Sequence, residues 1–521
     1  MQQPRRRYPI GTQTFSILRE GGYVYVDKTE LMYQLVHDDA RYVFLSRPRR
    51  FGKSLLLSTM SSYFEGKREL FKGLAIDRLE TQWEEHPVLW FDMSTAKHVE
   101  AVGLIQEIEG KLCEYEKLYG REASHININQ RLEGLIKHAY QLTGKQVVVL
   151  VDEYDSPLLD VVHDEDRMLQ LRQVMRCFYS PLKSCDPYLR FVFLTGITKF
   201  SQLSIFSELN NIRNISMLPE YAAICGISKE ELLTQLSEDI KLLAGKLRLT
   251  REEALLKLVE YYDGYHFTWP SPDMFNPYSL MSAFADGSIK SYWFGSGTPT
   301  SLVEMLRKYD VLPSEIGERE ARSSNFDSPT ERMTNITPLL YQSGYLTIKD
   351  YDAANELYRL EIPNREIRNG LMGSLLPKYV ELPPRLGNLT LANMHRALQN
   401  RDMDQALRVM QTYLSSIPYT DNTAYEGHYQ QVLYILFSLL NYYVDVEVHT
   451  ATGRVDLVMR TKTDLYIIEV KLNGSAEAAM SQINLKDYAA RFSTCGLPLT
   501  KVGVSFDQRT RTLSGWVIRK A

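Results

Sequence analysis

The sequence predicts an α/β protein in which two sheet-containing regions flank a mostly helical middle. Across residues 41–215, apolar strand patterns alternate with helical patterns, an order typical of a parallel sheet with helices on its faces. Residues 216–415 carry mainly helical patterns, with one hairpin pattern that leaves a winged-helix element open. Residues 416–521 return to strands between helices, which predicts a second, smaller α/β core.

Composition limits the class of protein. The 521 residues suffice for two or three domains, and 44% hydrophobic and 24% charged residues are ordinary for a globular protein. A net charge of -4 argues against a uniformly basic nucleic-acid-binding surface. Five scattered cysteines without metal-ligand spacing indicate a reducing compartment. Residues 1–13 lack an apolar signal segment, and no apolar run reaches the ~18 residues of a membrane span, so we expect a cytoplasmic protein without membrane contact.

The stretch Arg41–Met60 has the order strand, loop, Gly-Lys-Ser, helix. This order fits a P-loop (Walker A motif), whose backbone N–H groups and helix N-terminus bind phosphates, although Arg47 replaces its first glycine. Lys53 is expected to reach the β- and γ-phosphates and Ser54 to bind Mg²⁺. A surface turn before an ordinary helix is the competing interpretation. The residues expected to bind the nucleotide are Arg49, Arg50, Phe51, Gly52, Lys53, Ser54 and Leu55.

The segment Val147–Asp155 is the second part of the nucleotide prediction. Its apolar residues Val147–Val151 predict a strand that is buried on both faces. Asp152 follows where P-loop NTPases place the Walker B acid near Mg²⁺, and Glu153 is assigned to the attacking water. A solvated acidic turn after a strand is the alternative. Because the two motifs occur in the order of nucleotide-binding α/β domains, we expect ATP and Mg²⁺ as cofactors.

Other patterns complete the first predicted domain. They are a strand at 88–93, helices at 99–118, 126–142 and 168–179, and a strand at 189–194. Thr195 and Thr198 follow the last strand and are candidates for sensing the γ-phosphate. Threonine and glycine at a strand end also fit plain turn chemistry.

These motifs resemble a known family. SRPRRFGKSLLLST (residues 46–59) with LVDEYD (residues 150–155) resembles the AAA-ATPase-like family of bacterial proteins, whose members often carry a C-terminal PD-(D/E)xK nuclease-like domain. The resemblance extends to PIGTQTFSILREGGYVYVDKTELMYQL (residues 9–35) and to the last hundred residues. An arginine in place of the first glycine is usual in that family.

The chain is expected to divide into four parts. They are a P-loop domain with an N-terminal extension (1–215), a helical lid (216–300), a helical or winged-helix-like linker region (301–415) and a nuclease-like domain (416–521). Helices are expected at 229–243, 252–262, 336–343, 365–375 and 391–415, and a hairpin at 345–362. The hairpin tip is acidic, which favours a structural role over contact with DNA phosphates.

The last predicted domain carries a second chemical pattern. Its charged and polar candidates are Glu426 on a helix at 425–441, Asp456 on a strand at 453–460, Glu469 and Lys471 on a strand at 465–472, and Gln482 on a helix at 476–491. A strand at 501–506 is expected to close the unit. Glu469 and Lys471 are two residues apart and share one face of their strand, where burial is costly without a function. An exposed ion pair on an edge strand is the alternative.

This order resembles the PD-(D/E)xK, restriction-endonuclease-like core, written here with Val-Asp. The resemblance implies that Asp456 and Glu469 bind Mg²⁺ and that Lys471 positions the attacking water or offsets charge. Glu426 is expected to add a ligand or to orient the water shell of the metal. Gln482 is expected to contact the substrate backbone.

Two hypotheses from different classes follow. In the first, an ATPase controls a metal-dependent nuclease whose nucleic-acid substrate is DNA by resemblance, with RNA as the second candidate. In the second, the chain is an ATP-operated switch or scaffold whose nuclease-like domain only binds nucleic acid or a partner. A third hypothesis is that the P-loop domain transfers phosphate to a small substrate. It assigns no function to the last domain. Homo-oligomer formation is compatible with each.

Overall fold

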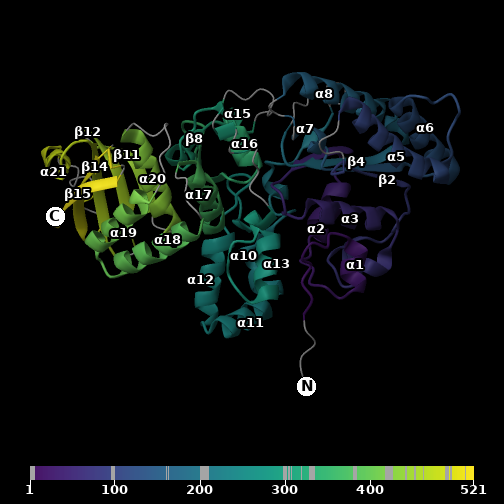
Figure 1. The fold of residues 1–521 in the computed structure, drawn as a ribbon. Coiled ribbons are helices and arrows are strands. Elements are labelled where there is room, and N and C mark those ends of the chain that lie inside the picture. The colour runs from purple at the N-terminus through teal and green to yellow at the C-terminus, as the bar shows by residue number, and fades with distance from the viewer. Residues whose placement is uncertain are drawn as a thin grey trace. The chain divides into compact units, whose positions relative to one another are not determined.

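The computed structural model describes residues 6–95, 100–159, 161, 164–199, 211–296, 302, 305–306, 308–317, 319–327, 335–379, 384–416, 426–440, 443–450, 453–461, 463–486, 492, 496–507, 509–510 and 512–520. The chain separates into two compact units. Unit 1 comprises Met1–Gly295 and Glu318–Asn364, and unit 2 comprises Ser296–Gly317 and Arg365–Ala521. The mixed α/β architecture confirms the predicted fold class (Figure 1).

A five-stranded parallel sheet forms the centre of the first part of unit 1. Its strands are β1 (Tyr42–Ser46), β2 (Val88–Asp92), β3 (Val147–Asp152), β4 (Leu189–Gly196) and β5 (Arg213–Asn214), in the order β2-β3-β4-β1-β5. The apolar runs of the sequence predict β1 to β4 closely, because strands that are covered on both faces are almost continuously apolar. The side chains of β1 and β3 are buried throughout.

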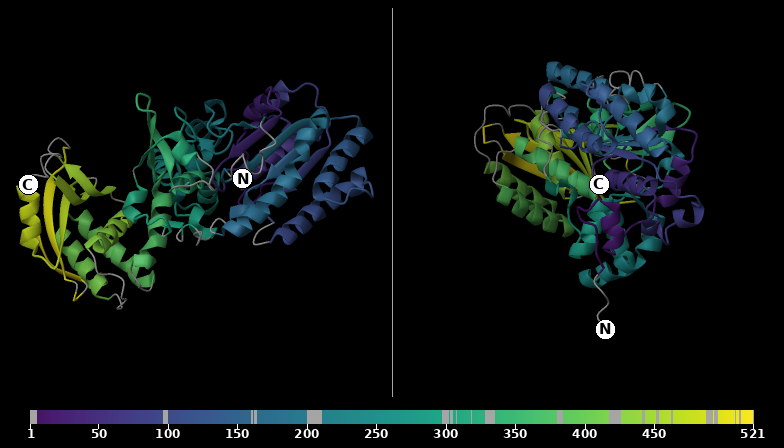
Figure 2. Two further views of the ribbon diagram at one scale, coloured as in Figure 1. Left: turned by 90° about the horizontal axis from the view of Figure 1, so that it is seen from above. Right: turned by 90° about the vertical axis from the view of Figure 1, so that its right-hand side faces the viewer.

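Helices cover both faces of this sheet (Figures 1 and 2). On one face, α5 (Ala101–Tyr119), α6 (Ile128–Thr143) and α8 (Glu165–Tyr179) share a core with alternate residues of β1 to β4. On the other face lies α3 (Lys53–Phe64), whose Phe64 ring lies 5.8 Å from that of Phe191. Each fully buried Val or Leu contributes about 1.5–3 kcal/mol. Short helices complete this part: α1 (Phe15–Glu20), α2 (Thr29–Val36), η1 (Arg68–Phe71), α4 (Ile76–Leu79), α7 (Ser156–Leu159), α9 (Pro181–Ser184) and η2 (Asp186–Tyr188).

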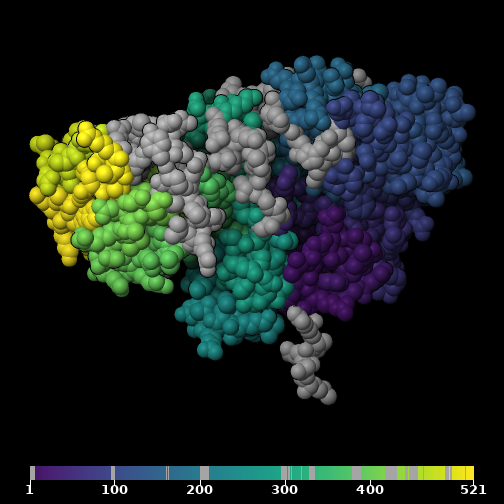
Figure 3. Space-filling view, viewed as in Figure 1, coloured from purple at the N-terminus to yellow at the C-terminus, as the bar shows by residue number. Residues whose placement is uncertain are grey.

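The second part of unit 1 is the predicted helical lid. Its elements are η3 (Pro219–Tyr221), β6 (Ile227–Ser228), α10 (Lys229–Gln235), α11 (Ser237–Leu247), α12 (Arg251–Tyr262), β7 (Met274–Phe275), α13 (Pro277–Asp286) and η4 (Trp293–Ser296). The single helix predicted at 229–243 is two helices, because the backbone of Leu236 leaves helical geometry. Val24 of the N-terminal segment belongs to the lid core, and Figure 3 shows purple N-terminal residues directly against the teal lid helices.

A small antiparallel sheet follows in unit 1. It orders β8 (Arg319–Ala321), β9 (Thr347–Asp352) and β10 (Leu357–Glu361) as β8-β10-β9, beside α15 (Ser323–Phe326) and α16 (Thr337–Gln342). The hairpin β9-β10 and helix α16 were expected, whereas the three-residue β8 was too short to leave a pattern. The winged-helix assignment stays a prediction.

Unit 2 is built around a mixed five-stranded sheet. Its order is β11 (Tyr443–Thr450), β12 (Gly453–Arg460), β13 (Leu465–Leu472), β14 (Leu499–Asp507) and β15 (Thr512–Lys520), with β13 and β14 parallel. Helix α20 (Glu426–Leu439) covers one face and α21 (Ala476–Leu485) the other (Figure 2). The sequence patterns did not predict β11 or β15, and the strand expected at 501–506 to close the unit is followed by β15. The edge strand β15 is half-buried and contains Gly515, which weakens a strand pattern.

Helices before residue 416 also belong to unit 2. They are α17 (Arg365–Tyr379), α18 (Pro384–Gln399) and α19 (Met403–Ser415), with η5 (Pro313–Ile316) from the earlier segment. The side chain of Gln411 donates to the carbonyl of Leu513 (2.6 Å), and Trp516 Nε1 donates to Asp404 (2.8 Å). The stretch predicted as one helix at 391–415 is divided because Asp402 caps α19. The four-part division of the chain stays a prediction.

Arg47 fixes the loop between β1 and α3. Its side chain is 1% exposed. Nη1 donates to the carbonyls of Ser46 (2.9 Å) and Ser216 (2.8 Å), and Nη2 to that of Tyr221 (3.2 Å). The guanidinium also lies 4.2 Å from the centre of the Phe267 ring. The residue that replaces the first glycine of the motif therefore ties the loop to three other segments of unit 1.

We expect Arg47→Met to destabilise unit 1 by about 3 kcal/mol, because buried carbonyls that lose their donors cost about 1–3 kcal/mol each. Chemical denaturation measures this loss. Arg49→Met is the matched control, since Arg49 is an exposed arginine of the same loop. Equal stability of the two variants would contradict the anchoring role of Arg47.

Candidate functional site

The loop between β1 and α3 has the backbone of an anion-binding turn. Gly52 has φ 93° and Arg50 has φ 67°, so two positions of the loop adopt the left-handed conformation. A Cβ on Gly52 would meet no described atom within 4 Å, so the backbone angle rather than crowding favours glycine. Helix α3 begins at Lys53, and the first N–H groups of a helix lack intrahelical partners. This arrangement suits a phosphate.

The side chain of Lys53 lies within the loop. Nζ donates to the carbonyl oxygens of Arg47 (3.0 Å) and Pro48 (3.1 Å). Burial lowers the pKa of Lys53, while the carboxylates of Asp152 and Glu153 act in the opposite direction. The ammonium group of Lys53 is thus bound by neutral carbonyl oxygens. An anionic phosphate would bind the same ammonium group more strongly.

Asp152 and Glu153 meet the loop at the end of β3. Burial raises the pKa of Asp152 to about 6, and the nearby Ser54 hydroxyl and the Lys53 charge oppose this rise. Glu153 has φ 46°, and its side chain lines the same cavity as Lys53 and Ser54. The structure therefore brings together the four residues to which the sequence assigned phosphate, metal and water.

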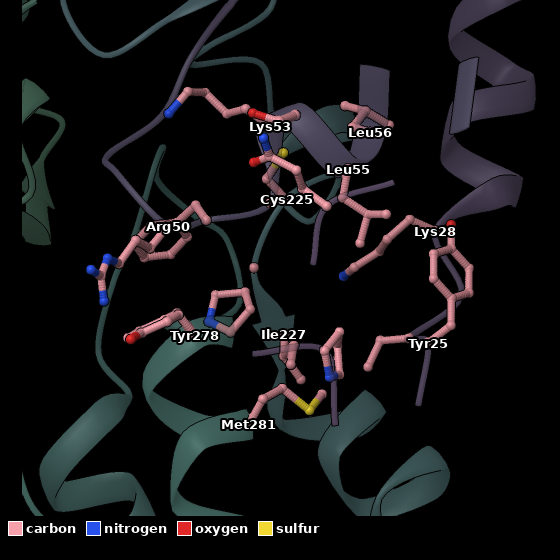
Figure 4. Close-up of a pocket in the computed structure, with 18 of the residues that line it drawn as sticks. Tyr25, Lys28, Arg50, Lys53, Leu55, Leu56, Cys225, Ile227, Tyr278 and Met281 are labelled. Atoms are coloured by element: carbon pink, nitrogen blue, oxygen red, sulfur yellow. The ribbon is translucent and has the colours of Figure 1, made fainter. Parts of the chain in front are cut away.

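A cavity of about 450 Å³ opens from this loop (Figure 4). All seven loop residues predicted to bind the nucleotide line it. Further walls come from segments far apart in the sequence: Pro9, Gly11, Thr12 and Gln13; Val24, Tyr25, Val26 and Lys28; Ile224, Cys225, Gly226 and Ile227; Pro277, Tyr278 and Met281. None of these wall residues was predicted individually to bind the nucleotide. The segments that carry them belong to the predicted lid (216–300) and to the stretch 9–35 that carries the family resemblance.

Thr195 does not line this cavity. Its buried hydroxyl donates to the carbonyl of Leu45 (2.8 Å) in the neighbouring strand. Asp155, which the sequence analysis left without a role, accepts from the backbone N–H (2.6 Å) and hydroxyl (2.7 Å) of Thr198. The sensor role of Thr195 stays a prediction, and the observed contacts join the ends of β1, β3 and β4.

The end of β4 is also bound to the small antiparallel region. The backbone N–H of Lys199 donates to Gln342 on α16 (2.7 Å), and its ammonium group pairs with Asp327 beside α15. A change at the carboxyl ends of β3 and β4 can therefore reach α15 and α16 through direct contacts.

Unit 2 brings together three charged residues on neighbouring strands. The backbone N–H of Val470 donates to Asp456 (2.8 Å), and that of Asp456 lies 3.4 Å from Glu469 Oε2. Lys471 Nζ lies 3.3 Å from Glu469 Oε1. Glu469 is 0% exposed on β13, which has neighbours on both sides, so these residues are not an exposed pair on an edge strand.

Burial raises the pKa of Glu469 to about 7, and the negative charge of Asp456 adds to this effect. Lys471 opposes it with a single positive charge. Two adjacent carboxylates next to one ammonium group leave a local excess of negative charge. Such an excess favours a cation.

Comparison with known proteins agrees with both groups of candidate site residues. Residues 9–206 match a family described as "Predicted AAA-ATPase", and residues 424–516 match the PD-(D/E)XK nuclease superfamily. A protein of Azotobacter chroococcum mcd 1, described as "Uncharacterized protein in vnfD 5'region", is 34% identical over 528 residues, covering 99% of both chains. The chain belongs to the AAA-ATPase-like family with a C-terminal PD-(D/E)XK domain. The similarity to this relative runs along almost the entire AAA-ATPase-like chain.

The donors of the PD-(D/E)XK domain fit a hard divalent cation. Asp456 and Glu469 supply carboxylate oxygens, which Mg²⁺ prefers, on adjacent strands. Within the ranges that the structure describes, no group of three or more His, Cys, Asp or Glu side chains is placed to hold a metal ion. The described donor set is therefore a pair, and bound water would complete the coordination shell.

Two further predicted residues belong to the helices of this domain. Glu426 is the first residue of α20, and its side chain lies outside the described residues. Gln482 is half-buried on α21, which packs against the face of β13 that carries Leu465 and Ile467. By strand alternation, Glu469 and Lys471 lie on that same face. Both assignments stay predictions.

No helix in the described part of the AAA-ATPase-like chain is long and apolar enough to cross a membrane.

We expect Mg²⁺ or Mn²⁺, titrated without nucleotide, to raise the unfolding temperature of the wild-type protein. A metal at 100 times its dissociation constant adds about 2.7 kcal/mol to stability. Asp456→Asn should abolish this gain, because it removes one anionic ligand. Asp507→Asn, at the end of the adjacent β14, is the control and should respond as wild type. An undiminished gain in Asp456→Asn would place the metal elsewhere.

Proposed function

We propose that this protein binds and hydrolyses ATP and that its C-terminal domain is a metal-dependent nuclease that cleaves phosphodiester bonds, of DNA in preference to RNA. The observation that carries the proposal is that each family match contains its own set of polar and charged groups gathered in one place. Lys53, Ser54 and Asp152 form one set, and Asp456 and Glu469 belong to the other. A cytoplasmic location accompanies the proposal.

In the ATPase site, the loop N–H groups and Lys53 would offset the negative charge of the β- and γ-phosphates. Ser54 and Asp152 would hold Mg²⁺, which supplies further charge neutralisation when bound. Glu153 would accept a hydrogen bond from the attacking water and orient it toward the γ-phosphate. Its position on the cavity wall, one residue after Asp152, supports this role.

In the nuclease site, Asp456 and Glu469 would hold Mg²⁺, which lowers the pKa of bound water and stabilises the leaving oxyanion. Lys471 would hold the water or offset charge in the transition state. Glu426 is proposed to support the water shell, and Gln482 to contact the substrate backbone. The location of Asp456, Glu469 and Lys471 on adjacent strands supports the assignment.

The two sites are proposed to be coupled, so that the nucleotide state of unit 1 permits or prevents cleavage by unit 2. The contacts of Lys199 with Asp327 and Gln342 support a route out of the ATPase site. The alternative is an ATP-operated switch or scaffold whose PD-(D/E)XK domain only binds nucleic acid or a partner. The presence of Asp456, Glu469 and Lys471 together favours cleavage over binding alone, since binding does not require this set.

We expect Lys53→Ala to abolish ATP binding, because the phosphates lose their principal cation. Glu153→Gln should bind ATP with wild-type affinity and lose turnover by a factor on the order of 10² or more. Calorimetry and phosphate release measure the two quantities. Unchanged affinity in Lys53→Ala would end the P-loop assignment, and full turnover in Glu153→Gln would remove Glu153 from water activation.

We expect wild-type protein with Mg²⁺ or Mn²⁺ to cleave nucleic acid, and Asp456→Ala and Lys471→Ala to lose cleavage while they retain ATPase activity. Single- and double-stranded DNA and RNA, each with and without ATP, are the substrates for this assay. Lys501→Ala is the matched control, because Lys501 on β14 contacts Asn484 rather than the carboxylates. Failure of the wild type to cleave any substrate would favour the switch or scaffold.

A further inference from the structure

The nucleotide cavity contains a cation that the phosphate loop does not supply. Among the described residues that line the cavity, Lys28 is the one lysine or arginine outside the loop. It lies at the start of α2, next to the cavity-lining segment that includes Tyr25. Ile227 and Met281 provide apolar walls near it (Figure 4). The cavity therefore has a partly buried ammonium group between these apolar walls and the side chain of Tyr25.

The contacts of Lys28 leave part of its donor capacity unused. Its side chain is 12% exposed, and Nζ lies 2.6 Å from both carboxylate oxygens of Glu231. An ammonium group has three N–H donors, so these two contacts leave one N–H without an acceptor among the described residues. Figure 4 shows the ammonium end of Lys28 directed into the cavity. An unsatisfied buried donor is costly, and an acceptor on a ligand would remove that cost.

Glu231 is held by contacts within the protein. It is absent from the cavity wall, and its Oε2 also accepts from the backbone N–H of Ser228 (2.8 Å) in the capping box of α10. At this end the cavity presents a donor without an available side-chain carboxylate. A purine base offers ring nitrogens as hydrogen-bond acceptors for such a donor.

We propose that Lys28 binds the base of the nucleotide by donating a hydrogen bond to a ring nitrogen of adenine. This inference rests on the proposed ATP binding and names the residue that recognises the base. The position of Lys28 fits the expected path of the nucleotide. The loop and Ser54 bind the phosphates, Leu55 and Thr59 line the cavity along the next turn of α3, and Lys28 lies on the wall beyond them.

The test compares Lys28→Met with wild type in binding ATP, GTP and inorganic tripolyphosphate, each with Mg²⁺, by calorimetry. We expect Lys28→Met to weaken ATP binding about tenfold, the effect of one lost charged hydrogen bond, and to leave tripolyphosphate binding unchanged. GTP, whose purine ring also carries nitrogen acceptors, should lose affinity by a similar factor. Equal losses for ATP and tripolyphosphate, or no loss for ATP, would overturn the inference.

A second measurement needs no variant. Wild-type protein is titrated with ATP and with its 1-deaza, 3-deaza and 7-deaza analogues, in which a C–H replaces one ring nitrogen. We expect one analogue to bind about tenfold more weakly than ATP, which identifies the accepting nitrogen. Equal binding of all four nucleotides would overturn the role of Lys28 while leaving ATP binding intact. No binding of ATP or tripolyphosphate by the wild type would instead overturn the proposed function itself.

Discussion

The buried guanidinium of Arg47 is the interaction on which the loop between β1 and α3 depends. Its N–H groups donate to carbonyl oxygens at the end of β1 and in the segment 216–221. Its guanidinium plane also packs over the ring of Phe267. Phe51 packs edge-on against the same aromatic group, and Trp293 Nε1 donates to the carbonyl of Arg49 (3.3 Å). A loop that glycine would leave flexible is therefore shaped by side chains from the lid. The sheet supplies the position of the loop, and the lid supplies its conformation.

Both candidate sites bury a carboxyl group close to a lysine. In the first, burial raises the pKa of Asp152 to about 6 although Lys53 is close. In the second, burial and Asp456 raise the pKa of Glu469 to about 7 although Lys471 is in contact. Carboxylates held in this way destabilise the empty fold and gain most from a bound cation. The two sites thus share one feature on separate sheets: a buried carboxyl group that a bound cation would stabilise in its charged form.

The sequence predicts the parts of this protein whose information is local. Apolar runs mark β1 to β4 and β13 because covered strands need little else, and the Gly-Lys-Ser and Glu-x-Lys spacings mark the groups that meet in each site. Edge strands carry weaker signals, which is why β15, with its glycine and half-exposed residues, was missed. Contacts between distant segments leave no local trace at all. Only the fold brings Lys28 to Glu231, 203 residues away. Only the fold places the hydroxyl of Thr198 where it donates to Asp155.

The discontinuity of unit 2 has a consequence for how such proteins are inherited. Segment 296–317 is separated from the remainder of this unit by residues that belong to unit 1. Ser314 from that segment is bound to Gln431 on α20 by two hydrogen bonds, of 3.0 Å and 2.9 Å, and Gln411 of α19 binds the edge strand β15. A gene fragment that begins at residue 416 would leave these polar groups without partners and uncover one edge of the sheet. Recombination at that point would not transfer an intact domain. The two halves of the chain are therefore expected to be inherited together.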